Sequence, residues 1–375
     1  MKKKLNYNLI CLVSALIILG FLFLATLSAT ASLNFFGNTN HYLFHQILYG
    51  LLPGIVLCVV AYKVPLAFIK KFAPALVLAN LGVMCLIFLP VLGSGFWGAK
   101  RWLNMGLFVF QPSEFLKISA ILYLAALISN KLYENHKKGW IYLVKSGYDS
   151  LRQMFLPFVI FLSIVGIILI FQPDVSTLGI ISLTLLTMYF SAGTPFFHTP
   201  LIILSGVAGL ALLIKFEPYR LERLLVFLHP ETDPLGIGFQ VKQSLIAIGS
   251  GGFFGKGLGM SSQKFGFLPA AMSDSIFAIL AEETGIIGCL IVVALFIWFG
   301  WMGLKIARSS NDKFAQLTAI GITSWIMIQA FVNISSAMGV FPLAGIPLPF
   351  FSYGGSHLTT ELIGIGLLLN ISKNT

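Results

Sequence analysis

Asp274 is the residue of this chain best placed for acid–base chemistry. It follows Leu268-Pro269-Ala270-Ala271-Met272-Ser273 and directly precedes an apolar run that begins near Ser275. A carboxylate at the start of a helix is stabilised in its anionic form, and partial burial raises its pKa again, which suits a general base. Asp and Ser are also common N-caps, so Asp274 could instead cap the helix, or Ser273 could cap it and leave Asp274 free.

The segment before Asp274 is rich in glycine and lysine. Glycine occupies six of the eleven positions from 249 to 259, which lets the backbone approach a ligand closely. Backbone amides there, together with Lys242, Lys256 and Lys264, could hold an anion such as a pyrophosphate. The segment lacks the Gly-Lys-Ser/Thr ending of a Walker loop. The alternative is a re-entrant or surface-lying segment that needs small residues for packing.

Two further basic clusters are candidates for contact with the same ligand. Arg220 and Arg223 lie in a Tyr-Arg-Leu-Glu-Arg run at the start of this region. Lys100, Arg101 and Trp102 combine two cations with an aromatic ring, a composition that also suits a membrane-interface anchor.

A carboxylate and a lysine open another apolar run. Glu114 and Lys117 are three residues apart after Pro112, so they share one helix face and can form an ion pair. We expect a structural clamp whose free face lines a polar cavity. Glu282 and Glu283 lie about two helical turns beyond Asp274, and we expect them to make structural hydrogen bonds or an ion pair. The histidines and cysteines show no metal-ligand spacing, and no cofactor is predicted beyond a possible divalent cation such as Mg²⁺ or Mn²⁺.

The composition indicates that these residues are positioned by membrane helices. Hydrophobic residues make up 57% of the 375 residues and charged residues only 10%, against about 25% in soluble domains. We predict an all-α polytopic membrane protein with a single domain over residues 1–375. Ten apolar runs reach spanning length: 9–30, 43–62, 72–92, 112–130, 153–171, 176–192, 199–216, 275–304, 314–338 and 356–372.

The net charge of +11 would suggest nucleic acid as a ligand in a soluble protein, but in a membrane protein it reports orientation. With the N-terminus inside, fifteen of the 24 Lys and Arg residues fall in inner segments and eight in outer segments. This bias favours both termini inside. It places the loops 93–111 and 217–274 on the outer face, the second between helices 7 and 8. Seven of the eight outer cations lie in these two loops, against the usual rule.

Six segments in this order resemble the SEDS family (shape, elongation, division and sporulation), which includes FtsW, RodA and SpoVE, and the resemblance covers nearly the whole chain. They are GAKRWLNMGLFVFQPSEFLK, QPDVST, YRLERL with FLHPETDPLGIGFQ, QSLIAIGSGGFFGKGLG, LPAAMSD with EETGIIG, and PLPFFSYGGS. Arg220 to Arg223 and Gln263-Lys264 are more similar to the FtsW branch, whereas Ile346 to Pro349 is more similar to RodA.

The resemblance implies a peptidoglycan glycosyltransferase. It would polymerise lipid II into lipid-linked glycan strands on the outer face of the cytoplasmic membrane, in cell division or elongation. The partner would be a class B penicillin-binding protein, with membrane lipid around the helices and no nucleic acid. Asp274 matches the catalytic aspartate that the family carries in a Leu-Pro-x-x-x-x-Asp context.

The chain departs from the family pattern next to this aspartate. Met272 and Ser273 stand where the family usually has His-Thr, and Ser275 stands where Phe is usual. Val-Ser-Thr follows Gln172-Pro173-Asp174 where Leu-Gly-Thr is usual. Two other functions fit the sequence: a transporter that flips lipid II, and a non-catalytic scaffold for a cell-wall transpeptidase. A transporter should concentrate charge at the bilayer midplane, whereas Glu114, Lys117, Glu282, Glu283 and Glu361 lie mostly toward the expected outer ends of the spans.

Overall fold

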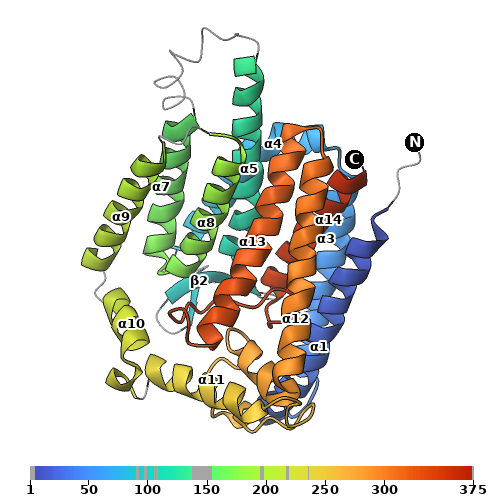
Figure 1. Ribbon diagram of the computed structural model, residues 1–375, viewed down its shortest axis with the longest axis vertical. Coiled ribbons are helices and arrows are strands. Elements are labelled where there is room, and N and C mark those ends of the chain that lie inside the picture. Colours follow the sequence, from blue (N-terminus) through green and yellow to red (C-terminus); the bar gives the residue numbers. More distant parts are fainter. Residues whose placement is uncertain are drawn as a thin grey trace.

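The computed structural model describes residues 5–89, 93–96, 99–104, 106, 109–136, 154–194, 198–216, 219–234 and 236–373. Helices make up most of this chain (Figure 1), and each of the ten predicted spans overlaps at least one of them. The bundle helices are α1 (Tyr7–Phe36), α2 (His41–Gln46), α3 (Leu52–Lys63), α4 (Leu66–Leu86), α5 (Pro112–His136), α7 (Leu156–Phe171), α8 (Val175–Ser191), α9 (His198–Phe216), α12 (Ile276–Ser309), α13 (Lys313–Ala337) and α14 (Gly355–Lys373).

Membrane-spanning character is clear for part of this bundle. Six helical segments in the described chain are long and apolar enough to cross a membrane: α1, α2 through α3, α4, the first part of α5, α12 and α13. Helices α7 and α8 are apolar but shorter. The protein is therefore a multi-pass membrane protein.

Within the second segment, a π-helical turn (Ile47–Leu51) separates α2 from α3. The Gly50 carbonyl in this turn accepts a hydrogen bond from Thr359 Oγ1 at 3.0 Å.

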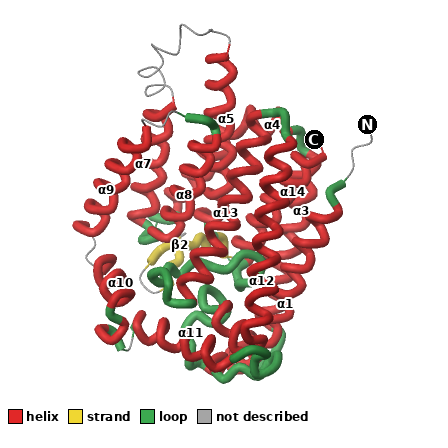
Figure 2. The backbone as a smooth tube through the Cα atoms, viewed as in Figure 1, coloured by secondary structure: helices red, strands yellow, loops and turns green. Residues whose placement is uncertain are grey.

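The longer connecting segments that the structure describes gather toward one end of the bundle, here called the loop end (Figure 2). The start of α1 and the end of α14 lie at the opposite end (Figure 1). The predicted loop 217–274 is not irregular throughout, because it contains α10 (Tyr219–Leu228), α11 (Ile237–Gly251) and two short 3-10 turns. Figure 2 shows α11 running across the loop end rather than along the bundle.

The predicted loop 93–111 contains a small sheet that the sequence did not indicate. Strands β1 (Gly93–Phe96), β2 (Ala99–Asn104) and β3 (Val109–Phe110) form an antiparallel sheet in the order β1-β2-β3. Gly93 is opposite Leu103, and Leu103 is opposite Phe110. The sheet therefore leads the chain from α4 back into α5.

Small residues allow close helix packing between α3 and α14. A Cβ atom added to Gly366 would lie 2.3 Å from the Cys58 carbonyl oxygen, and one added to Gly54 would lie 2.5 Å from a Leu362 methyl carbon. Asn370 continues the contact, since its amide donates to the carbonyls of Ala61 and Val64 at 2.8 and 2.6 Å. Close approach of backbones is the usual basis of helix association in membranes.

Helix α12 is interrupted at Gly285. Its φ of 66° and ψ of −165° are not helical, and a Cβ there would lie 2.4 Å from the Gly255 nitrogen. The loop after α11 fills the break. Lys256 N donates to Glu282 O at 2.9 Å, and Ile286 N donates to Gly252 O at 3.0 Å. The interrupted helix thus keeps its backbone groups hydrogen-bonded, as a membrane protein requires.

We predict that Gly366→Ala lowers the stability of the protein, because its methyl group would overlap the α3 backbone. Overpacking typically costs about 1–3 kcal/mol. Gly179→Ala is a matched control, since Gly179 lies mid-helix in α8 with no atom within 4 Å of an added Cβ. Helix propensity alone favours Ala over Gly by about 1 kcal/mol at both positions. Thermal unfolding in detergent measures the difference, and equal melting temperatures for the two variants would contradict the close approach.

Candidate functional site

Asp274 lies at the loop end, immediately before α12. The N-cap of α12 is Ser275, which makes no side-chain capping bond, so neither Asp274 nor Ser273 caps the helix. The hypothesis that Asp274 serves as a cap is therefore wrong. Ser275 Oγ instead donates to Pro269 O at 3.0 Å and accepts a hydrogen bond from Gln240 Nε2 at 3.0 Å. These bonds leave the Asp274 carboxyl group available for another role.

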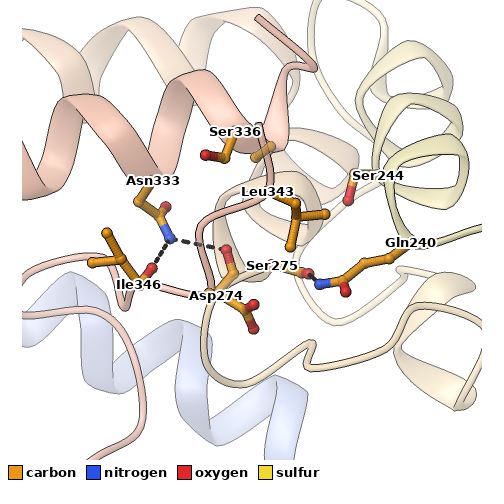
Figure 3. Close-up of a pocket in the computed structure, with 10 residues that line it drawn as sticks. Gln240, Ser244, Asp274, Ser275, Asn333, Ser336, Leu343 and Ile346 are labelled. Carbon is orange, nitrogen blue, oxygen red and sulfur yellow. Dashed lines mark hydrogen bonds between the residues drawn. The ribbon is translucent and has the colours of Figure 1, made fainter. Parts of the chain in front are cut away.

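The main chain around Asp274 is held on one side by Asn333 of α13. Its amide nitrogen donates to Asp274 O at 2.9 Å and to Ile346 O at 2.7 Å (Figure 3). In the same view the Asp274 carboxyl group points away from Asn333. The backbone of the residue is therefore fixed by α13, while the carboxyl group faces the other side.

A proline-rich loop between α13 and α14 holds the chain just before Asp274. Tyr353 N donates to Met272 O at 2.8 Å, and the Ser352 hydroxyl donates to Ser273 O. Gly345 belongs to the same loop, and a Cβ added there would lie 3.7 Å from the Asp274 Oδ2 atom. The loop therefore passes close to the carboxyl group.

Other motifs named in the sequence contact this loop or the start of α14 directly after it. Ser356 Oγ accepts from Gln111 N at 3.1 Å, and Ser176 donates to Ala344 O. Ser113 Oγ donates to Asp174 Oδ2 at 3.1 Å, and Asp174 caps α8 by accepting a hydrogen bond from Thr177 N. The starts of α5, α8 and α14 thus meet at the same place.

Burial and three polar neighbours act on the pKa of Asp274 in opposite directions. Burial raises the pKa of Asp274 above its ordinary value. Hydrogen bonds from Ser273 and Gln240 and the positive charge of Arg223 lower this pKa, but burial prevails. The Ser273 hydroxyl lies 2.9 Å from Asp274 Oδ1. A carboxylate of this kind binds a proton more readily than an exposed one.

The closed space behind Asp274 is small. The cavity that Gln240, Ser244, Asp274 and Asn333 help to line holds about 10 Å³, roughly the room of one water molecule. A sugar does not fit there. A substrate would have to reach Asp274, which is partly exposed, from outside this cavity.

A second polar cluster lies buried within the helices. Lys117 Nζ is 3.0 Å from both carboxylate oxygens of Glu114 and donates to Gln329 Oε1 at 3.0 Å. His357 of α14 joins the pair, with Nδ1 2.9 Å from Glu114 Oε2. Its Nε2 lies 2.8 Å from Glu361 Oε1. The predicted Glu114–Lys117 pair is thus one part of a larger cluster, here called the charge cluster, made of Glu114, Lys117, His357 and Glu361.

The charge cluster is connected to the proline-rich loop. Glu361 Oε2 accepts a hydrogen bond from Phe350 N at 2.9 Å, and Gln329 Nε2 donates to Pro347 O at 3.0 Å. Trp325 Nε1 donates to Gln329 Oε1 at 2.9 Å. Since the same loop holds Met272 and Ser273, the buried charges and Asp274 belong to one continuous set of contacts.

The predicted cations lie in different places. Arg223 is exposed and close enough to Asp274 to act on its charge. Lys256 pairs with Glu282 at 2.7 Å, and Lys264 contacts the Gly259 carbonyl. Arg101 reaches across to the carbonyls of Gln172 and Pro173.

Four predicted substrate contacts remain, and the structure describes the side chains of two of them. Lys242 is exposed on α11, and Trp102 is half-buried in β2. The side chains of Lys100 and Arg220 lie outside the described residues. The structure therefore associates one predicted cation, Arg223, with Asp274, and assigns Arg101 and Lys256 to contacts within the protein.

Three important residues were not recognised in the sequence. Gln329 and Asn333 are four residues apart on α13, and His357 precedes Glu361 by four residues on α14. Such spacing puts both members of each pair on one helix face, which was the available signal. This spacing does not show which side chains on other helices each residue contacts. Among the described residues, no group of three or more His, Cys, Asp or Glu side chains could hold a metal ion.

These observations define a class of protein: a multi-pass membrane protein with a carboxylate at one end of its helical bundle, held by buried polar contacts. The family model of FtsW, RodA and SpoVE proteins, described as cell cycle proteins, matches residues 6–375. The chain belongs to this family.

Similar proteins cover most of the chain. Stage V sporulation protein E of Bacillus subtilis (strain 168) is 40% identical over 291 residues, which are 78% of this chain and 76% of that protein. The probable peptidoglycan glycosyltransferase FtsW of Nitrosococcus halophilus (strain Nc4) is 36% identical over 366 residues, covering 96% of this chain and 90% of the relative.

Solved structures share the fold. One chain from a structure described as "Structural coordination of polymerization and crosslinking by a peptidoglycan synthase complex" aligns with a TM-score of 0.78 at 25% identity, covering 99% of this chain and 98% of that one. The rod shape determining protein RodA of Thermus thermophilus aligns with a TM-score of 0.70 at 22% identity, covering 99% and 97%.

We predict that Glu114→Ala strongly destabilises the protein, because Lys117 and His357 would each lose a buried carboxylate partner. Breaking a buried ion pair from one side costs about 3–5 kcal/mol. The double variant Glu114→Ala with Lys117→Met also removes the uncompensated lysine charge, so we expect it to unfold at a higher temperature than Glu114→Ala alone. Equal expression and melting of Glu114→Ala and the wild type would count against the clamp.

Proposed function

We propose that this protein is a peptidoglycan glycosyltransferase that polymerises lipid II into glycan strands. The observation that carries the proposal is Asp274, a carboxylate with a raised pKa whose main chain is fixed by two elements and whose side chain is uncommitted to capping. The family membership and the relatives named as probable peptidoglycan glycosyltransferases support it.

The proposed topology places this site on the outside of the cell. Ten spans with both termini in the cytoplasm, within a single domain over residues 1–375, would put the loops 93–111 and 217–274 on the outer face of the cytoplasmic membrane. The excess of Lys and Arg in the opposite segments supports this orientation. The start of α1 and the end of α14 lie at the same end of the bundle, as an even number of spans requires.

The proposed reaction uses Asp274 as the general base. A sugar hydroxyl of one lipid-linked glycan attacks the anomeric carbon of a second lipid-linked glycan. The proton of that hydroxyl passes to the Asp274 carboxylate. The bond from the anomeric carbon to the pyrophosphate oxygen breaks, and the lipid pyrophosphate leaves with the bonding electrons. Cations must stabilise this leaving group, and Arg223 is the candidate that already acts on Asp274.

Other cations would contribute from farther away. Lys242 and Lys264 come from the same region, while the side chains of Lys100 and Arg220 lie outside the described residues. A divalent cation is a candidate for the same work. The pyrophosphate oxygens of the substrate would then be among the ligands of that cation, as substrate phosphates commonly are for Mg²⁺.

The proposed partner is a class B penicillin-binding protein, a transpeptidase that crosslinks the new strands in division or elongation. Its support is the likeness to a chain from a structure described as coordinating polymerization and crosslinking in a peptidoglycan synthase complex. The exposed apolar faces of several helices are surfaces on which a membrane partner could pack.

We expect Asp274→Asn to abolish polymerisation while the protein remains folded, because the amide keeps the size of the side chain but cannot take up the proton. The measurement is glycan formation from lipid II by purified protein with its transpeptidase present and that partner's own catalysis disabled. Glu231→Gln, the same acid-to-amide change on the exposed turn Pro230–Thr232, controls for nonspecific damage. Glycan product from a folded Asp274→Asn variant would show that another residue is the general base. No product from the wild type, with lipid II movement across liposomes intact, would favour a flippase.

The raised pKa of Asp274 also predicts the pH dependence of the reaction. The base works only when ionised, so kcat/KM should fall as the pH decreases through this pKa, at a pH above the ordinary value of about 3.9 for aspartate. Ser273→Ala removes a hydrogen bond that lowers the pKa, so its acid limb should move to higher pH with the same plateau. Ser244→Ala, which alters the same cavity, should not move it. An unchanged acid limb in Ser273→Ala would contradict the assignment.

A further inference from the structure

The loop between α11 and α12 exposes an unusual number of large apolar side chains. Six of them are more than half exposed, with Phe253 at 71% and Phe254 at 83%; the others are Leu258, Met260, Phe265 and Phe267. Residues 252–267 are called the apolar loop below. Exposed apolar clusters of this kind mark contact with a membrane or another protein.

The apolar loop is joined directly to the exposed apolar face of α12. Ile286 N donates to Gly252 O at 3.0 Å, and Ile287 N donates to Phe253 O at 3.4 Å. Ile286 and Ile287 are themselves about half exposed, and Leu290 continues the exposed face one turn further. This face of a highly apolar spanning helix has to contact lipid or a membrane partner. The loop and the helix therefore form one continuous apolar surface.

The position of the kink in α12 indicates the height of the apolar loop in the membrane. Residues 286–309, beyond Gly285, would extend about 36 Å as a regular helix, against about 30 Å for the hydrocarbon core. The segment before the kink is different, because every residue from Ile276 to Glu283 is buried within the protein. The spanning part of α12 thus begins near Gly285, where the apolar loop is hydrogen-bonded to it.

Two lysines of the apolar loop suit a location at lipid headgroups. Lys256 pairs with Glu282 but keeps 37% of its side chain exposed. Lys264 contacts the Gly259 carbonyl, and its Nζ lies 5.5 Å from the centre of the Phe265 ring. Apolar side chains flanked by lysine are typical of segments that lie at the boundary between headgroups and acyl chains.

We propose that the apolar loop inserts into the lipid bilayer at this boundary, next to the kink of α12. The occupant of its exposed surface is lipid, because the loop continues the apolar face of α12 at the level where that helix enters the bilayer. The inference does not depend on the proposed reaction. Its consequence is that the segment leading to Asp274 is held at a constant height above the hydrocarbon core, where the headgroup of a membrane lipid lies.

The test compares the depth of three single fluorescent labels. Cys11, Cys58, Cys85 and Cys289 are first replaced by serine, and an environment-sensitive fluorophore is then attached at Phe254→Cys. Leu290→Cys on α12 is the lipid-facing reference, and Glu231→Cys on the exposed turn Pro230–Thr232 is the aqueous reference. Each protein is reconstituted singly into lipid nanodiscs, without a partner, and quenched either by lipids brominated near the headgroup end or by iodide.

We expect the label at position 254 to be quenched by the brominated lipid as strongly as the label at position 290, and to be shielded from iodide relative to position 231. Iodide quenching equal to that at position 231 would overturn the proposal, because the loop would then face water. Weak quenching by both reagents would also overturn it, since protein would then cover the loop. A label at Phe267→Cys repeats the test if the first variant melts below its cysteine-free parent.

Discussion

Four ionisable side chains buried between α5 and α14 set the constraint on which the site depends. Charges inside a membrane protein are costly unless each has a close partner, and removing one partner leaves the other uncompensated. Glu114, Lys117, His357 and Glu361 meet this condition by bridging the two helices, while Gln329 brings in α13. The relative positions of α5, α13 and α14 are therefore specified by polar contacts as well as by apolar packing.

The same side chains transmit this constraint to the loop end. Glu361 and Gln329 use their remaining hydrogen-bonding groups on the main chain of the proline-rich loop, and that loop holds the main chain of Met272 and Ser273. Asp274 is thus positioned through its backbone, while its carboxyl group accepts a hydrogen bond from Ser273 and does not cap the helix. A general base needs this combination, because its geometry has to be fixed while its carboxylate remains open to a proton.

The region before Asp274 supplies backbone hydrogen bonds at a break in a membrane helix. The glycines after α11 let the chain lie against the kink at Gly285, where it supplies the hydrogen bonds that the interrupted helix lacks. Irregular backbone at the membrane boundary is tolerated only when its polar groups are satisfied in this way. Several of these glycines make close contact with α12, as the packing alternative to an anion-binding loop predicts. Lys256 is likewise committed to Glu282, so the positive charge close to Asp274 comes from Arg223.

Much of this architecture could be predicted from the sequence. Runs of apolar residues determined which segments form the long helices, and the three-residue spacing of Glu114 and Lys117 gave their ion pair, because this pair depends only on neighbours within one helical turn. The antiparallel sheet, the helix across the loop end and the kink at Gly285 were not predicted, because they depend on contacts made after folding. His357 is the clearest case. Its four-residue spacing from Glu361 places both side chains on one face of α14, but its other carboxylate partner, Glu114, meets it only when α5 packs against α14. Tertiary structure also decided that Asp274 is not a cap, since this depends on how Asn333 and the proline-rich loop hold the chain.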